Sequence, residues 1–170
     1  MIRSTHRHLW QALLAALSAA GLATGLPAVP MSADAPVADL SCTIIVTTDV
    51  HPGVTPELRH LATTSHGLTG TAICTGTVDG QPVTGPGRFA IEEQLVGDCT
   101  QAAGTGTFQL RIHPAGGTET VAGRFAATVS AAGDIHTGDL SGTAVVVSAV
   151  GDCFTTPLTR TTAVLTVHVT

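Results

Sequence analysis

Hydrophobic and polar residues alternate with a period of two along most of the chain that follows Asp39. At residues 107–113 every second side chain is large and hydrophobic, and those between are polar. The alternation recurs at residues 118–130 and 161–169, and this region shows no convincing helical period. Such a pattern is typical of antiparallel strands that pack one face on a core and expose the other to water.

The alternation predicts about seven to eight strands. We expect them at residues 41–50, 60–78 (one long bent strand or two), 88–96, 105–113, 118–130, 140–150 and 161–169. Segment 140–150 is apolar on both faces, which predicts a strand covered on both sides. Short strands at this spacing predict an all-β fold, either a single antiparallel β-barrel or a β-sandwich.

Turn-forming residues separate the expected strands. Pro52-Gly53 suits a type II turn, and Asp79-Gly80 is typical of a short hairpin. Gly133-Asp134 and Gly138-Asp139 indicate further reversals of the chain.

The first 38 residues follow another pattern. Arg3 and Arg7 precede an apolar run at residues 9–26, and small residues follow at 33–38. This arrangement predicts a secretory signal peptide and short leader at residues 1–38, and a single exported β domain at residues 39–170. An uncleaved membrane anchor is the alternative, because the run approaches the length of a membrane span. We expect no membrane span in the mature chain.

All four cysteines, Cys42, Cys74, Cys99 and Cys153, lie in the expected domain. An even number in an exported chain predicts disulfide bonds, here two. Cys42 shares the parity of the apolar residues in its strand, and the strand of Cys74 could return beside it, which favours a Cys42–Cys74 bond. Cys99–Cys153 follows by elimination. A simple meander of the expected strands argues against this second pair, because it would put the two cysteines at opposite ends.

A Gly-Asp-Cys step occurs twice after an apolar strand, at residues 97–99 and 151–153. We interpret the glycine and aspartate as a strand-ending turn and the cysteine as the anchor of the loop. A binding site shared by the two segments is the alternative.

The net charge and the aromatic content of the chain argue against one class of binding partner. The chain carries a net charge of −5 and has no tyrosine, and its one tryptophan, Trp10, lies in the expected signal peptide. Nucleic acid is therefore not an expected partner, because the domain lacks both a basic surface and the aromatic side chains that stack on bases.

Several short motifs resemble those of a loose family of small secreted actinobacterial β-rich proteins of unknown function. These are Ser41-Cys42-Thr43 at the start of a Thr/Val-rich strand, the segments 51–56 and 104–108, and the late Cys153 before a final Thr/Val strand. The resemblance implies a β-rich, disulfide-linked exported domain. It implies no activity and no functional residues.

The sequence gives no support for catalysis. Glu92 and Glu93 are the one adjacent carboxylate pair, but neighbours on a strand point to opposite faces and cannot act together across a cleft. Asp134 and His136 form the densest ligand-like cluster, and a polar turn explains them equally well. We therefore expect no catalytic residues, no metal site and no cofactor.

Glu93 is the most unusual single residue. It falls on the strand face of Phe89, Ile91 and Leu95, where an ionised carboxylate without a partner is costly. If Glu93 is buried, its pKa should rise, and it becomes a candidate functional residue. The alternative is a β-bulge or an edge position that returns it to water.

These observations predict a secreted, non-catalytic β domain that acts as a binding or structural module outside the cell or in its envelope. A small-ligand-binding barrel is one alternative. A secreted enzyme inhibitor that presents the loop 100–104 or 154–160 is the other. The expected partner is accordingly a small apolar ligand or an extracellular protein.

Overall fold

The computed structural model describes residues 36–129 and 133–170, with side chains throughout except at residues 133–137. Nearly all of the expected signal peptide and leader (residues 1–38) lies outside the described residues. Within the two described ranges, no helix is long and apolar enough to cross a membrane.

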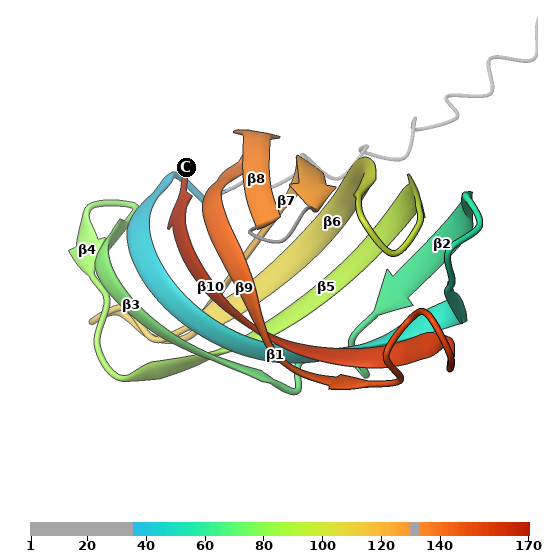
Figure 1. Ribbon diagram of the computed structural model, residues 1–170. Helices are drawn as coiled ribbons and strands as arrows, with labels where there is room; N and C mark the ends of the chain where they lie inside the picture. The colour runs from blue at the N-terminus through green and yellow to red at the C-terminus, as the bar shows by residue number, and fades with distance from the viewer. Residues whose placement is uncertain (1–35, 130–132) are drawn as a thin grey trace, which may run out of the picture. The chain divides into compact units, whose positions relative to one another are not determined.

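The predicted all-β class is confirmed, because the described chain forms strands throughout and no helix. The strands are β1 (Ala38–Val54), β2 (Arg59–Thr64), β3 (Gly70–Val78), β4 (Gln81–Pro82), β5 (Pro86–Gly97), β6 (Ala102–Ile112), β7 (Glu119–Val129), β8 (Gly133–Gly138), β9 (Leu140–Val150) and β10 (Leu158–Val169) (Figure 1). All belong to one sheet in which every pairing is antiparallel.

The pairings close this sheet into a ring. From β5, consecutive strands pair through β6, β7, β8 and β9 to β10, and β10 pairs with β1. β2 and β3 share the place between β1 and β5: β3 pairs with residues 38–45 of β1, and β2 with residues 49–51. The sheet is therefore closed and barrel-like, with one side of each strand turned inward. In barrels of about eight strands the interior is filled by side chains or holds one small ligand.

The interior is densely filled at one end, by the larger of two hydrophobic clusters, and a smaller cluster of Val50, Leu61, Leu95 and Ala102 lies at the other end. Phe89, Phe108, Leu40, Ile44 and Leu110 are among the largest fully buried side chains of the interior, and all lie towards the end where β1 begins and β6 finishes. Along the inner face of β6, large residues at 112, 110 and 108 give way to Gly106, Gly104 and Ala102. The other end of the ring therefore has too little side-chain volume to fill it.

The expected segment 60–78 is two strands, one of the two arrangements considered. β2 ends at Thr64, and Ser65 continues the contact with β5: the Ser65 N–H donates to the Ile91 carbonyl, and the Ile91 N–H donates to Ser65 Oγ (2.9 Å each). The chain then leaves the sheet for a short turn before β3. Because β2 and β3 pair with different halves of β5, the pair acts as one interrupted strand of the ring.

Two expected turns are wrong. β1 continues through Pro52 and Gly53 to Val54, with an irregular pairing to β10 after Asp49, so this dipeptide bends a strand instead of reversing it. Gly133 and Asp134, expected as a reversal, instead begin the strand β8 (Gly133–Gly138), which lies between β7 and β9. The reversal expected at Gly138-Asp139 is confirmed, because β8 ends at Gly138 and pairs antiparallel with β9, which begins at Leu140. The hairpin at Asp79-Gly80 is confirmed, since both residues have the positive φ that its turn requires (49° and 75°).

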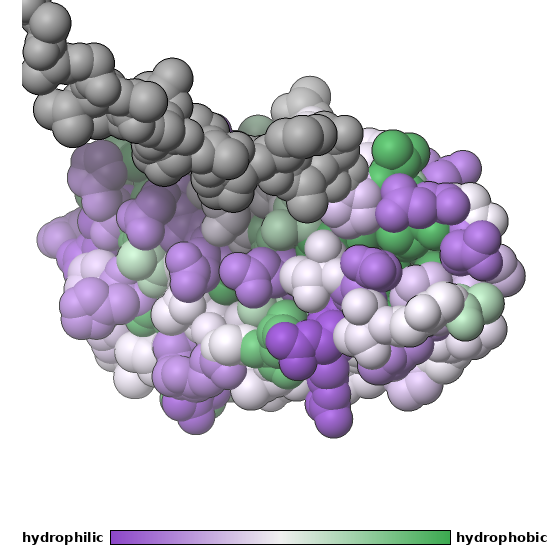
Figure 2. Space-filling view, turned by 180° about the vertical axis from the view of Figure 1, so that it is seen from behind, coloured by the Kyte–Doolittle hydropathy of each residue, from purple (hydrophilic) through white to green (hydrophobic). Residues whose placement is uncertain are grey.

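β9 is a strand as expected, but its expected cover on both faces is wrong. Val145, Val147 and Val150 expose 52%, 59% and 56% of their surface, and no described segment covers them. Val146 instead lines the hollow interior. Elsewhere polar residues surround smaller hydrophobic areas on the outer face seen in Figure 2. The apolar run of β9 thus reflects a hollow on one side and solvent on the other.

Candidate functional site

The unfilled end of the ring contains a cavity of about 420 Å³. Its wall comes from the later parts of β1 and β5, from β2, from the start of β6, from the end of β7 and from the facing parts of β9 and β10. Most lining side chains are aliphatic, among them Val50, Leu61, Leu95, Val129 and Leu158. A concave, mainly apolar space with a few polar groups is typical of a small-molecule site.

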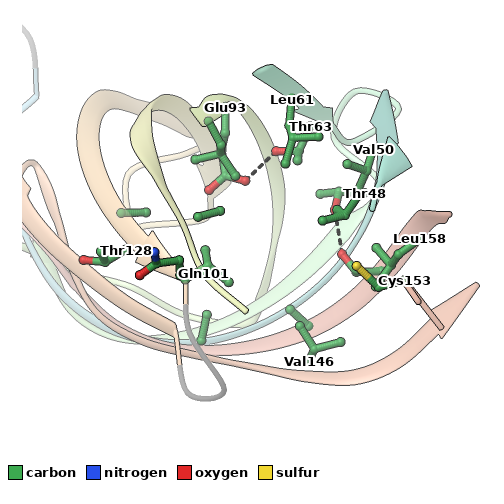
Figure 3. A pocket seen from close by; sticks show the side chains of 18 of the residues that line it. Thr48, Val50, Leu61, Thr63, Glu93, Gln101, Thr128, Val146, Cys153 and Leu158 are labelled. Carbon is green, nitrogen blue, oxygen red and sulfur yellow. Dashed lines mark hydrogen bonds between the residues drawn. The ribbon is translucent and has the colours of Figure 1, made fainter. Parts of the chain in front are cut away.

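Two pairs of polar side chains point into this apolar space (Figure 3). The Thr63 hydroxyl of β2 donates to Glu93 Oε2 of β5 at 2.5 Å, across a directly opposed strand pair. The hydroxyls of Thr48 on β1 and Thr161 on β10 are hydrogen-bonded to each other at 3.0 Å. One threonine hydroxyl donates to the other, which leaves the hydrogen of the accepting hydroxyl free, and Glu93 keeps its second carboxyl oxygen for other partners.

Glu93 lies on a regular part of β5 that is paired on both sides, so the bulge or edge alternative does not apply. Its neighbour on β6 is Gly106, which has no side chain, and the Phe125 ring of β7 lies over that glycine, 2.5 Å from where a Cβ would stand. Burial in these surroundings raises the pKa of Glu93 above its usual range, and the hydrogen bond from Thr63 opposes the rise.

The raised pKa of Glu93 predicts how stability varies with pH. The folded protein holds this proton to higher pH than the unfolded chain, whose glutamate titrates near its ordinary value of 4.5, so the free energy of unfolding should fall as pH rises above 4.5 and through the raised pKa. Glu93→Gln should abolish this fall and be more stable than wild type above the window. Urea unfolding from pH 4.5 to 8 tests this, with Glu92→Gln on the outer face as the matched control.

The carboxyl groups whose pKa is lowered do not change the free energy of unfolding between pH 4.5 and 8. For Asp98 and Asp152 the pKa lies below the ordinary 3.8, so the stability they contribute is complete above that pH and lost only as pH falls below it. Equal pH profiles for wild type and Glu93→Gln would show that Glu93 is not buried in solution.

Two disulfide-linked loops frame the cavity. Cys99 follows β5 and Cys153 follows β9, and the predicted Cys99–Cys153 bond joins them, with Cα atoms 5.7 Å apart. Both cysteines and Asp98 line the cavity. The other predicted bond, Cys42–Cys74, is also confirmed and links directly opposed residues of β1 and β3 at the filled end.

Each Gly-Asp-Cys step forms the turn expected from the sequence. Asp98 Oδ1 accepts hydrogen bonds from the N–H groups of Thr100 (2.7 Å) and Gln101 (3.1 Å). Asp152 Oδ1 accepts from Thr155 (2.7 Å) and Thr156 (3.0 Å) in the same way. The Thr155 hydroxyl, followed by these N–H groups, lowers the pKa of Asp152 to about 2. The Asp98 and Asp152 carboxylates therefore stabilise the turns of their own loops.

The remaining candidates are Glu92, Asp134 and His136. Glu92 is exposed on the outer face, as expected from its position beside Glu93. Asp134 and His136 lie in β8, but their side chains are outside the described residues. Among the described side chains, no group of three or more could hold a metal ion.

A separate ionic cluster lies outside the cavity. Asp49 on β1 accepts from Arg160 Nε of β10 and contacts His66 Nε2 in the turn after β2, both at 2.5 Å. The hydrogen bonds from Arg160 and His66 lower the pKa of Asp49. Because every group is paired within the cluster, its evident role is to tie β1, β10 and this turn together.

Sequence reasoning allowed for an interior with room for a small ligand, in the barrel alternative, but missed which threonines line the cavity. Thr48, Thr63 and Thr161 have the inward parity of their strands, but the sequence does not show which strands face one another. A usable signal was present in the small inward residues Ala127, Ala144 and Ala163, which line the same end of the ring.

Comparisons of this chain with models of protein families, with curated proteins and with solved structures found no match. Proposals about function therefore rest on the cavity and its side chains.

Proposed function

We propose that the protein is a non-catalytic extracellular binding protein that holds a small, largely apolar molecule inside its closed sheet. The observation that carries this proposal is the cavity of about 420 Å³ at the end of the interior opposite the packed phenylalanine and leucine side chains. An unfilled apolar interior forfeits packing contacts, and a bound apolar molecule restores them. The ligand-binding barrel, an alternative at the level of sequence, thus becomes the favoured form of the binding module.

The chemistry of the wall favours binding over catalysis. Glu93 and Asp98 are the titratable side chains among the described lining residues, and Asp98 is held by its own turn. One free carboxyl cannot provide the acid and base pair that most hydrolytic reactions use.

The extracellular setting is part of the proposal. Two disulfide bonds are consistent with an oxidising environment. The basic and apolar pattern of the first 38 residues supports export.

Filling the cavity should prevent binding without harming the fold. Ala127 and Ala163 line the cavity from β7 and β10. The double variant Ala127→Leu/Ala163→Leu should weaken binding of a compact neutral probe, 1-adamantanol, by about tenfold or more, because leucine side chains occupy the volume the probe needs. Its free energy of unfolding should stay unchanged or rise by about 1 kcal/mol. Isothermal titration calorimetry and urea unfolding measure the two effects.

Val164→Leu is the matched control, since this neighbour of Ala163 lies on the other face of β10, opposite Val145 of β9 and Ile45 of β1. It should bind 1-adamantanol as wild type does. Equal binding of 1-adamantanol to the wild-type protein and to the filled variant would rule out the cavity as the site.

One observation favours a second function, inhibition of a secreted enzyme. Phe154 exposes 69% of its surface in the loop that the Cys99–Cys153 bond and Asp152 hold in shape. A rigid loop with an exposed aromatic side chain loses little conformational entropy on binding a protein. Tight one-to-one association with a protease from culture supernatant, measured by native mass spectrometry, would decide for this function.

A further inference from the structure

The cavity has an acidic group without a counter-charge. Its described wall contains no arginine or histidine, and the chain has no lysine. Glu93 receives the Thr63 hydroxyl at Oε2, and no described residue binds its other oxygen. Figure 3 shows the carboxyl pointing into the space between β5 and the facing wall.

These contacts discriminate between ligand head groups. A ligand carboxylate would meet another carboxyl in a low-dielectric space with no cation, which is unfavourable. A neutral hydroxyl would gain one ordinary hydrogen bond. A protonated amine would gain a charge-assisted hydrogen bond and would also neutralise Glu93, so it alone removes the cost of an ionised carboxylate there.

We propose that the cavity binds a small apolar amine in its ammonium form, with the Glu93 carboxylate as counter-ion and the aliphatic wall around its hydrocarbon body. This inference rests on the proposed function, because it specifies the ligand of the same cavity. Thr63 positions the carboxyl by holding Oε2, and Oε1 is left to accept from the ammonium group.

Binding is coupled to the proton on Glu93. In the empty cavity burial favours the protonated acid; when the ammonium group binds, Glu93 becomes a carboxylate and its proton passes to solvent. The affinity for an amine should therefore increase as pH rises through the raised pKa of Glu93. The affinity for a matched alcohol should not increase.

Glu93 also borders a second hollow beside β6 and β7, and the charged residues Glu92 and Arg124 line that hollow with it. Within the cavity itself, few other charges face Glu93. The inward residues of β6 and of the facing parts of β1, β9 and β10 are uncharged, and Asp98 is engaged in its turn. On β2, Arg59 has the inward parity of Leu61 and Thr63, but it lies at the beginning of the strand and pairs with Glu57 at 3.0 Å.

The test compares three probes of one shape: 1-adamantylamine, 1-adamantanol and 1-adamantanecarboxylic acid. Their dissociation constants are measured by calorimetry at pH 5 and pH 8 for wild type, Glu93→Gln and Glu92→Gln. At pH 8 the amine should bind wild type about tenfold or more tightly than the alcohol, and the acid least tightly. Glu92→Gln should keep this preference, because Glu92 is exposed on the outer face. Glu93→Gln, which keeps the shape of the side chain, should lose it together with the increase from pH 5 to pH 8.

Other results would contradict either the amine proposal alone or the proposed function as well. If the alcohol binds and the amine binds no tighter, or if the preference survives in Glu93→Gln, the amine proposal fails while the cavity remains a binding site. If none of the three probes binds wild type, the proposed function fails and the amine proposal with it.

Discussion

Replacing Cys99 and Cys153 together by alanine should lower the free energy of unfolding by about 4 kcal/mol. The bond closes a loop between residues 54 positions apart, and in the chain-entropy model its loss frees the unfolded chain by about that amount. Urea unfolding at equilibrium measures the change. A second effect is expected on binding, because the loops that frame the cavity are no longer tied to each other.

The double replacement of Cys42 and Cys74 is the matched control. That bond spans 32 positions, so its loss should cost a similar amount, slightly below 4 kcal/mol. It lies at the filled end, and binding of 1-adamantanol should survive under conditions where the variant is folded. Equal loss of binding in both variants would show that the Cys99–Cys153 bond stabilises the domain without shaping the cavity.

The local part of the fold was predictable because it depends on neighbours in sequence. The parity of Phe108, Leu110 and Ile112 identifies the inner face of β6, and all three are buried. The same parity rule placed Cys42 on the inner face of β1 and led to its correct partner, Cys74. Strand faces repeat every two residues whatever the rest of the chain does, so they can be derived from a short window.

The direction of later strands was not predictable, because one strand was missed. Residues 133–138 carry a Gly-Asp pair at their start and a glycine at their end, which are turn-forming residues, yet they pair with β7 and β9. An added strand reverses the direction of every strand after it. With β8 counted, the turn after β9 lies at the same end as the turn after β5, which brings Cys99 and Cys153 together. The strand-direction argument against this disulfide is therefore wrong.

The inward face of one site residue, Glu93, was predictable from the sequence, but the position and lining of the cavity were not. The face of Glu93 follows from parity, but its burial depends on Thr63 from β2 and on Gly106 and Phe125 from two other strands. The cavity is the shortfall of side-chain volume summed over seven strands, a quantity no single segment contains. For the same reason the valines of β9 were expected to be covered, although one side of that strand faces a hollow.

The two ends of the interior should respond differently to truncation. Phe89 is fully buried at the filled end, and its ring stacks on that of Phe108 with centroids 6.2 Å apart and planes inclined by 19°. Phe89→Ala removes contacts on all sides and leaves a new cavity, so it should lower the free energy of unfolding by about 3–5 kcal/mol. Urea unfolding at a pH where both variants fold measures the loss.

Leu61→Ala provides the contrast at the hollow end. Leu61 is equally buried from solvent, but it lines the existing cavity and already lacks packing partners on that side. Its truncation should therefore cost about 2 kcal/mol, the lower limit for a buried leucine. A cost near 4 kcal/mol would mean that this end is packed in solution and leaves no room for a ligand. A small cost, together with weaker binding of 1-adamantanol, would instead show that Leu61 contributes mainly to binding the ligand and little to the stability of the fold.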